Sequence, residues 1–119
     1  MKENKIWGET EELWSYATGE VHRISAIAGG YSSIHKHESK YNYFYVESGE
    51  LIIERWKNKN IIDKTTLKKG ESTVVPPGEF HRFTAKTKTD AIEIYWVELN
   101  KKDITRRNQG GVKSVVKTR

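Results

Sequence analysis

The sequence predicts an all-β protein, built as a sandwich, a jelly roll or a small barrel. Short runs of branched and aromatic residues alternate with polar residues at a period of two. Gly, Pro and Asn separate these runs at regular intervals, and no segment keeps an apolar repeat of 3.6 residues. Seven or eight short strands separated in this way are typical of the three architectures.

The first clear strand is expected at 20–28, where His22, Ile24 and Ala26 share one face before a Gly-Gly pair. Further strands are expected at 41–47, 50–56, 61–67, 72–75, 80–85 and 91–99. The runs at 41–47 and 50–56 flank Ser48-Gly49, which predicts a hairpin. Pro77 and Gly78 suit the central positions of a type II turn. A short turn of helix is expected at 9–14.

The length of 119 residues predicts one domain. The absence of cysteine excludes disulfides, a zinc ribbon and a thiol nucleophile. No apolar run is long enough for a membrane span. The N-terminus has no apolar signal region and carries acidic residues, so a cytoplasmic protein is expected.

The net charge of +5 is concentrated at the C-terminus. Residues 101–119 hold seven Lys or Arg and one Asp, whereas the rest of the chain has fourteen basic and fifteen acidic residues. We therefore divide the chain into a domain at 1–100 and a basic tail at 101–119. Such a tail can be solvated or can contact phosphates. Because the domain itself is nearly neutral, nucleic-acid binding is disfavoured.

The histidines indicate a metal site. On an extended strand His35 and His37 point the same way, and neutral imidazole is the usual ligand for Zn, Fe, Mn or Ni. A useful site needs a third ligand, and His81 follows the rigid Pro-Pro-Gly turn. The alternative is a chance His-x-His on polar surface. His22, on an early strand, is predicted to be a hydrogen-bonded structural residue.

Two longer motifs contain these histidines. Residues 29–49 read G-x5-H-x-H-x4-N-x6-G, and residues 70–85 read G-x5-P-x-G-x2-H-x3-A. Their order and spacing resemble the two motifs of the cupin superfamily. The resemblance implies a single-domain cupin jelly-roll β-barrel in which His35, His37 and His81 are metal ligands.

The fourth cupin ligand differs in this chain. The family commonly has Glu where this sequence has Asn42, and an amide oxygen is a neutral, weaker donor. Asn42 is therefore a tentative ligand, and Glu38 from the neighbouring loop is an alternative. The resemblance leaves open a three-histidine centre, as in the thiol dioxygenases, or a cupin that has lost its metal.

Four segments resemble the cupin domain of type II mannose-6-phosphate isomerases: IWGETEELW, VHRISAIAGGYSSIHKH, LKKGESTVVPPGEFHRFTA and IEIYWVELNKKDITRR. The resemblance implies metal-assisted conversion of an aldose phosphate to a ketose phosphate. A substrate phosphate needs a cation, for which Arg106 is the main candidate and Arg82 the second. Arg82 should point away from His81 because it is the next residue on the strand. No residue is identified as the general base.

Three functions therefore remain open: a sugar-phosphate isomerase-like enzyme, a three-histidine iron dioxygenase or lyase, and a non-catalytic sugar-binding cupin. In each case the expected partner is a small molecule, a sugar or a sugar phosphate. Tyr41, Tyr43 and Tyr45 should share the outer face of their strand, which predicts a homodimer.

Overall fold

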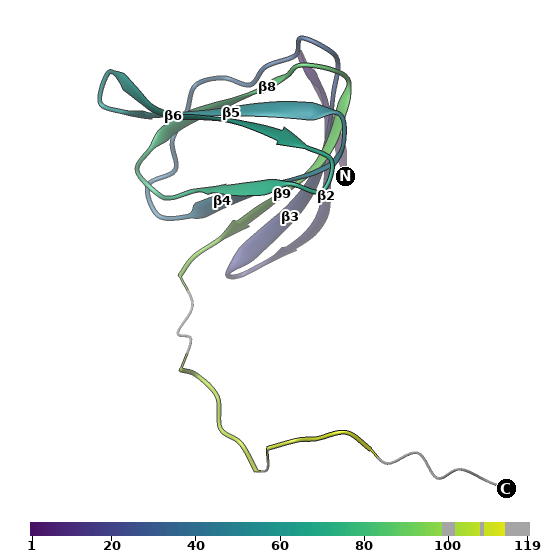
Figure 1. Cartoon of the computed structure of the whole chain (residues 1–119), viewed down its shortest axis with the longest axis vertical. Helices are drawn as coiled ribbons and strands as arrows, with labels where there is room; N and C mark the ends of the chain where they lie inside the picture. Colours follow the sequence, from purple (N-terminus) through teal and green to yellow (C-terminus); the bar gives the residue numbers. More distant parts are fainter. Residues whose placement is uncertain (99–101, 108, 114–119) are drawn as a thin grey trace, which may run out of the picture.

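The computed structural model describes residues 1–98, 102–107 and 109–113 (Figure 1). Its described residues form nine strands: β1 (Lys2–Lys5), β2 (Gly8–Tyr16), β3 (Gly19–Ala26), β4 (Tyr41–Ser48), β5 (Glu50–Lys57), β6 (Asn60–Lys68), β7 (Ser72–Val75), β8 (Phe80–Ala85) and β9 (Thr89–Trp96). All seven predicted strands are present, with ends that shift by at most a few residues. Leu99, at the end of the predicted last strand, lies outside the described residues.

The strands form two antiparallel sheets that face each other as a jelly roll (Figure 1). The larger sheet has the order β1-β2-β3-β9-β4-β7, and the smaller has the order β6-β5-β8. Apolar side chains of the two inner faces form one core: Ile24, Ala26, Phe44, Val46, Leu51, Ile53, Leu67, Val75, Phe83, Ala85 and Ala91. The all-β prediction is therefore confirmed.

The predicted hairpin between residues 41–47 and 50–56 is wrong. Strand β4 pairs with β7 and β9, whereas β5 pairs with β6 and β8. Gly49, between β4 and β5, has a φ of 89°, and a Cβ there would lie 2.3 Å from the carbonyl oxygen of Lys88. This tight approach, which only glycine permits, carries the chain from one sheet to the other.

The helical turn expected at 9–14 is also wrong, because these residues belong to β2. Strand β2 pairs with β3 along its length, with Thr10 opposite Ile24 and Trp14 opposite Val21. The residues of this segment are half-buried or exposed, and its charged residues do not alternate with apolar ones as in a typical strand. Pairing with a neighbouring strand decides its conformation instead.

Outside the barrel, residues 102–107 and 109–113 of the tail are exposed and extend away from the two sheets in Figure 1. The remaining residues of the predicted tail, 101, 108 and 114–119, lie outside the described residues. In the described ranges, no helix has the length and apolar character needed to cross a bilayer.

Candidate metal centre

The segment that contains His35 and His37 is held against β8. His35 and His81 exchange two backbone hydrogen bonds, from His35 N to His81 O at 3.1 Å and from His81 N to His35 O at 2.8 Å. Gly78 N also donates to His37 O at 2.8 Å, and its φ of 84° fits the predicted type II turn. Apart from this single bridge, residues 35–37 are not in a strand, so the expectation of a regular strand there is wrong.

These backbone contacts bring the three predicted histidines together. The rings of His35 and His81 have centroids 4.5 Å apart, and His37 lies 5.2 Å from His35 and 5.3 Å from His81. One nitrogen from each ring lies within 4.8 Å of the others. Ligands of one ion are separated by roughly 3 Å, given bonds of about 2.1 Å, so small ring movements would let all three bind.

The remaining ring nitrogens are arranged as in a metal site. His35 Nδ1 lies 3.0 Å from Ser33 O, and His81 Nδ1 lies 3.1 Å from Glu79 O. An Nδ1–H bound to a carbonyl leaves the Nε2 lone pair available, as is usual for metal-binding histidine. His37 Nε2 is buried and has no hydrogen-bond partner. A divalent cation would satisfy this orphaned atom, so the three side chains fit a metal.

The environment keeps two of these rings neutral. Burial lowers the pKa of His81 to about 4, and the neighbouring His35 and His37 contribute to the same effect. Burial, followed by the charge of His35, lowers the pKa of His37 to about 4. Both rings are therefore unprotonated at neutral pH, the form that binds metals.

Asn42 lies next to this cluster. It is completely buried on β4, and its Oδ1 lies 3.1 Å from His81 Nε2. That separation also matches two neighbouring ligands of one ion, so the position of Asn42 fits the ligand role that the resemblance suggests. The alternative ligand Glu38 forms an ion pair with Lys36 at 3.3 Å and is largely exposed, so this structure does not bring it to the cluster.

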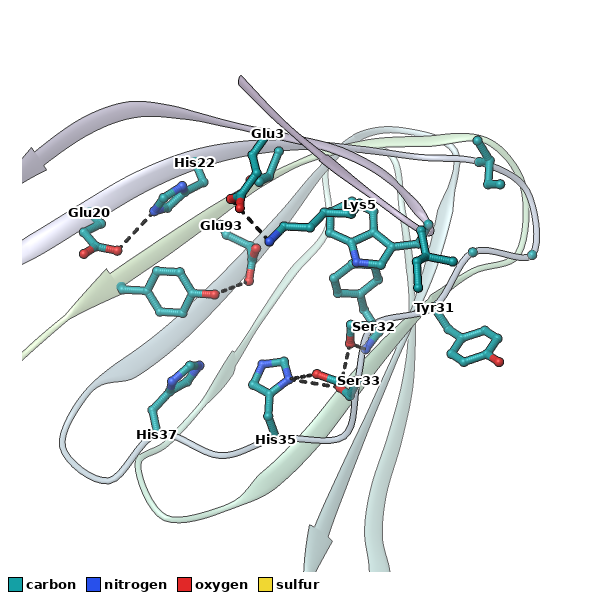
Figure 2. A pocket seen from close by; sticks show the side chains of 18 of the residues that line it. Glu3, Lys5, Glu20, His22, Tyr31, Ser32, Ser33, His35, His37 and Glu93 are labelled. Carbon is teal, nitrogen blue, oxygen red and sulfur yellow. Dashed lines mark hydrogen bonds and ion pairs between the residues drawn. The ribbon is translucent and has the colours of Figure 1, made fainter. Parts of the chain in front are cut away.

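A cavity of about 900 Å³ lies beside the histidines (Figure 2). His35 and His37 line one wall, and His81 is buried behind them. On the facing wall lie Glu93 and the hydrogen-bonded pair Glu20 and His22, while the N-terminal strand β1 lies above them (Figure 2). Further lining residues are Glu3, Lys5, Ile6, Trp7, Thr10, Ile27, Ala28, Gly29, Gly30, Tyr31, Ser32, Ser33, Lys40, Phe83 and Tyr95.

Glu93 was missed by the sequence analysis. It is 8% exposed and accepts hydrogen bonds from Tyr95 Oη at 2.8 Å and Asn42 Nδ2 at 3.2 Å. Burial raises the pKa of its carboxyl group, although the two hydrogen bonds oppose this effect. The signal in the sequence was an acidic residue inside the apolar run AIEIYW, in alternation with Ala91 on the inward face.

His22 makes the hydrogen bond that the sequence analysis predicted, because its Nε2 lies 3.1 Å from Glu20 Oε2. Its ring also contacts Tyr95, with centroids 5.7 Å apart. His22 also lines the cavity, together with His35 and His37.

The two candidate arginines lie elsewhere. Arg82 donates to Glu54 at 3.0 Å and lies beside the rings of Tyr31 and Trp56, on the opposite face of β8 from His81. This agrees with the predicted direction of its side chain. Arg106 is exposed on the tail and is not part of the cavity lining.

Comparison with known proteins places the chain in a family. A profile of the cupin domain matches residues 22–98. Among solved structures, KdgF from a Halomonas species has a TM-score of 0.72 and 16% identity, over 83% of this chain and 89% of that protein. No curated protein matches the sequence significantly.

Two larger proteins contain a similar fold. CapF, a capsular polysaccharide assembling protein from Staphylococcus aureus, has a TM-score of 0.69 and 24% identity, over 87% of this chain and 30% of that one. An oxalate decarboxylase variant from Bacillus subtilis has a TM-score of 0.73 and 13% identity, over 82% of this chain and 27% of the enzyme. At these identities the similarity concerns the fold. Since the family profile covers well over half of the sequence, the chain belongs to the cupin family.

Proposed function

We propose that the protein is a metal-dependent cupin enzyme that isomerises a small carbohydrate, in the manner of a sugar-phosphate isomerase. The observation that supports this proposal best is the arrangement of one cavity. Three imidazoles meet on one side of it, and a histidine–carboxylate pair lies on the other. The resemblance to type II mannose-6-phosphate isomerases agrees with this arrangement.

His35, His37 and His81 would hold the metal, with Asn42 Oδ1 as the fourth protein ligand. The position of Asn42 beside His81 Nε2 supports that assignment. A divalent ion bound here would polarise the carbonyl and hydroxyl oxygens of the sugar.

His22 is the general base in this proposal. Glu20 binds its Nε2 and so fixes the ring orientation, in the way that a carboxylate orients a catalytic histidine. The ring would take a proton from the carbon next to the sugar carbonyl. It would then return that proton to the former carbonyl carbon, while the hydroxyl proton passes to the former carbonyl oxygen. Together these two transfers convert an aldose to a ketose.

Substrate recognition would use the mouth of the cavity. Trp7 and Tyr31 offer aromatic surface, and Ser33 offers a hydroxyl group. Lys5 and Lys40 are the cationic side chains of the lining, and Lys40 Nζ lies 4.3 Å from the centre of the Tyr95 ring. We therefore assign a substrate phosphate to these lysines. They replace Arg106, the candidate from the sequence, because Arg106 does not line the cavity.

Two measurements test the proposal. Elemental analysis of protein purified without chelators should find close to one transition metal per chain. Incubation with mannose 6-phosphate and related aldose phosphates in D₂O should place deuterium next to the carbonyl, observed by NMR. A His22→Gln variant should keep its metal and lose the exchange. Protein that binds metal and exchanges no sugar proton contradicts the isomerase assignment.

A three-histidine iron enzyme is the second candidate. It is favoured by Asn42, since the chain lacks the carboxylate that the first cupin motif commonly supplies. Iron in the purified protein, together with oxygen consumption or loss of CO₂ from a small acid, would support a dioxygenase or lyase. Sugar binding without metal or turnover would instead identify a non-catalytic cupin.

We also propose that the protein is a homodimer, with residues 1–100 as the domain and 101–119 as its tail. The outer face of the larger sheet supports the dimer, because apolar residues adjoin there across five strands. Tyr43 pairs with Ile94 and Val74, and Ile94 pairs with Val21, which pairs with Trp14. A cytoplasmic location stays a prediction.

A further inference from the structure

Glu93 is a buried carboxylate with no Lys or Arg in an ion pair with it among the described residues. It is 8% exposed, and the basic side chains that act electrostatically on it are His22 and His35. Its hydrogen bonds come from the neutral groups of Tyr95 and Asn42. Burying a charge without an opposite charge is costly, so the ionised form of Glu93 requires a cation nearby.

Asn42 connects this carboxylate to the histidines. Its Nδ2 donates to Glu93 Oε2 at 3.2 Å, and its Oδ1 lies 3.1 Å from His81 Nε2. An ionised carboxylate can only accept hydrogen bonds, so Glu93 selects the NH₂ side of the amide. The amide oxygen is consequently turned toward the histidine cluster, which is the orientation that a metal ligand needs.

The sheet makes this contact possible. Phe44 is opposite Glu93, and Asn42 is opposite Tyr95, in the pairing of β4 with β9. Asn42 and Glu93 are therefore diagonal neighbours on the inner face, a distance that long side chains can bridge. The Glu93 carboxylate on β9 thus lies next to the side chain at position 42 on β4, where the first cupin motif commonly has a carboxylate.

We propose that Glu93, acting through Asn42, replaces the metal-binding carboxylate that the first motif lacks. Asn42 would supply the oxygen ligand, and Glu93 would supply the negative charge and fix the orientation of the amide. Glu93 is in this sense a positioning residue. The inference rests on the proposed function in one respect, namely that the three histidines hold a divalent cation.

A double-mutant cycle tests this inference, with Co²⁺ as the probe. Its affinity is measured by competition with a coloured chelator in the wild type, Glu93→Gln, Asn42→Glu and the double variant. Glu93→Gln should weaken Co²⁺ binding about 10- to 100-fold, the usual effect of losing a group that orients a ligand. The double variant, which returns the carboxylate to position 42, should recover most of that loss.

Glu20→Gln is the matched control. Glu20 is another carboxylate on the cavity wall, but it is bonded to His22 rather than to Asn42. Its replacement removes the same charge and should change Co²⁺ affinity by less than about threefold. An equal loss in both variants would show a general electrostatic effect and would overturn the specific role of Glu93.

The outcomes separate this inference from the proposed function. A wild type that binds no Co²⁺ overturns the metal site itself. If the wild type and the Glu93→Gln variant bind Co²⁺ with equal affinity, only the role of Glu93 is overturned.

If the Glu93→Gln variant does not fold, the Asn42→Glu variant tests the inference by itself. Two adjoining carboxylates should lower the unfolding midpoint of its metal-free form, and Co²⁺ should raise that midpoint more than in the wild type. Unchanged midpoints in both forms would overturn the inference.

Discussion

His35 and His81 form a hydrogen-bonded backbone pair, and their imidazole rings lie side by side with centroids 4.5 Å apart. Two distant segments of the chain are thereby joined at the site where a cation would bind. The main chain therefore places these two side chains next to each other. This relationship makes the site preorganised.

The double variant His35→Ala, His37→Ala should lose its bound transition metal and still fold. Both side chains are only half-buried and lie outside the apolar core, so their removal leaves the core intact. Elemental analysis and circular dichroism measure the two effects. His22→Ala, a histidine of the same cavity outside the cluster, should keep the metal. Retained metal in the double variant would contradict the assignment.

Metal-free protein should become less stable as the pH falls from about 6.5 toward 4. Burial lowers the pKa of His37 and His81 to about 4 in the fold, whereas histidine in an unfolded chain has a pKa of about 6.5. Between these pH values the unfolded chain therefore binds more protons than the folded chain, and the free energy of unfolding decreases as the pH falls. Above about pH 6.5 the full contribution is present.

Thermal unfolding of chelator-treated protein across this pH range measures the effect. A His37→Gln variant should show a shallower dependence, because one of the two titrating rings is gone. A midpoint that stays constant from pH 7 to pH 4.5 in the wild type would refute the prediction.

Phe44→Ala should lower the free energy of unfolding by about 3–5 kcal/mol. The Phe44 side chain is 1% exposed, and its ring contacts Phe83 and His81, so its removal leaves a cavity beside the histidine cluster. Tyr45→Ala, one residue along β4 on the outer face, should cost less. Urea titration measures the free energy of unfolding of both variants. Equal losses would mean that the inner face of β4 is not part of the packed core.

The protein should be a dimer in light scattering at micromolar concentration. Replacing Tyr43 with Glu on the outer face should produce monomers, because burying the new charge in an apolar interface is costly. Ile61→Glu is the control, since Ile61 is exposed beyond this face, at the β5–β6 turn. A monomeric wild type would refute the dimer.

Removing residues 101–119 should leave metal content and the unfolding midpoint unchanged, because the described residues of this tail are exposed. The same truncation tests nucleic-acid binding. If the tail bound DNA, the full chain would show salt-dependent affinity that the truncated chain lacks. We expect no such difference.

The sequence was sufficient to predict the seven strands from β3 to β9 and the meeting of the three histidines. Alternation and turn residues identified the strands, and motif spacing identified the three histidines that cluster. It was not sufficient for β2, whose charged residues alternate little, because sheet pairing decides that conformation. Glu93 was missed for a related reason, since its importance arises only when β9 lies beside β4.

The cavity is assembled from two sources that can change independently. His35 and His37 come from the segment after β3 and adjoin His81 of β8, whereas Glu3 and Lys5 come from β1 at the edge of the larger sheet. An edge strand can be exchanged or lengthened without disturbing the histidine cluster. Relatives of this protein could therefore diverge in what they recognise while the histidines at the base of the cavity are inherited unaltered.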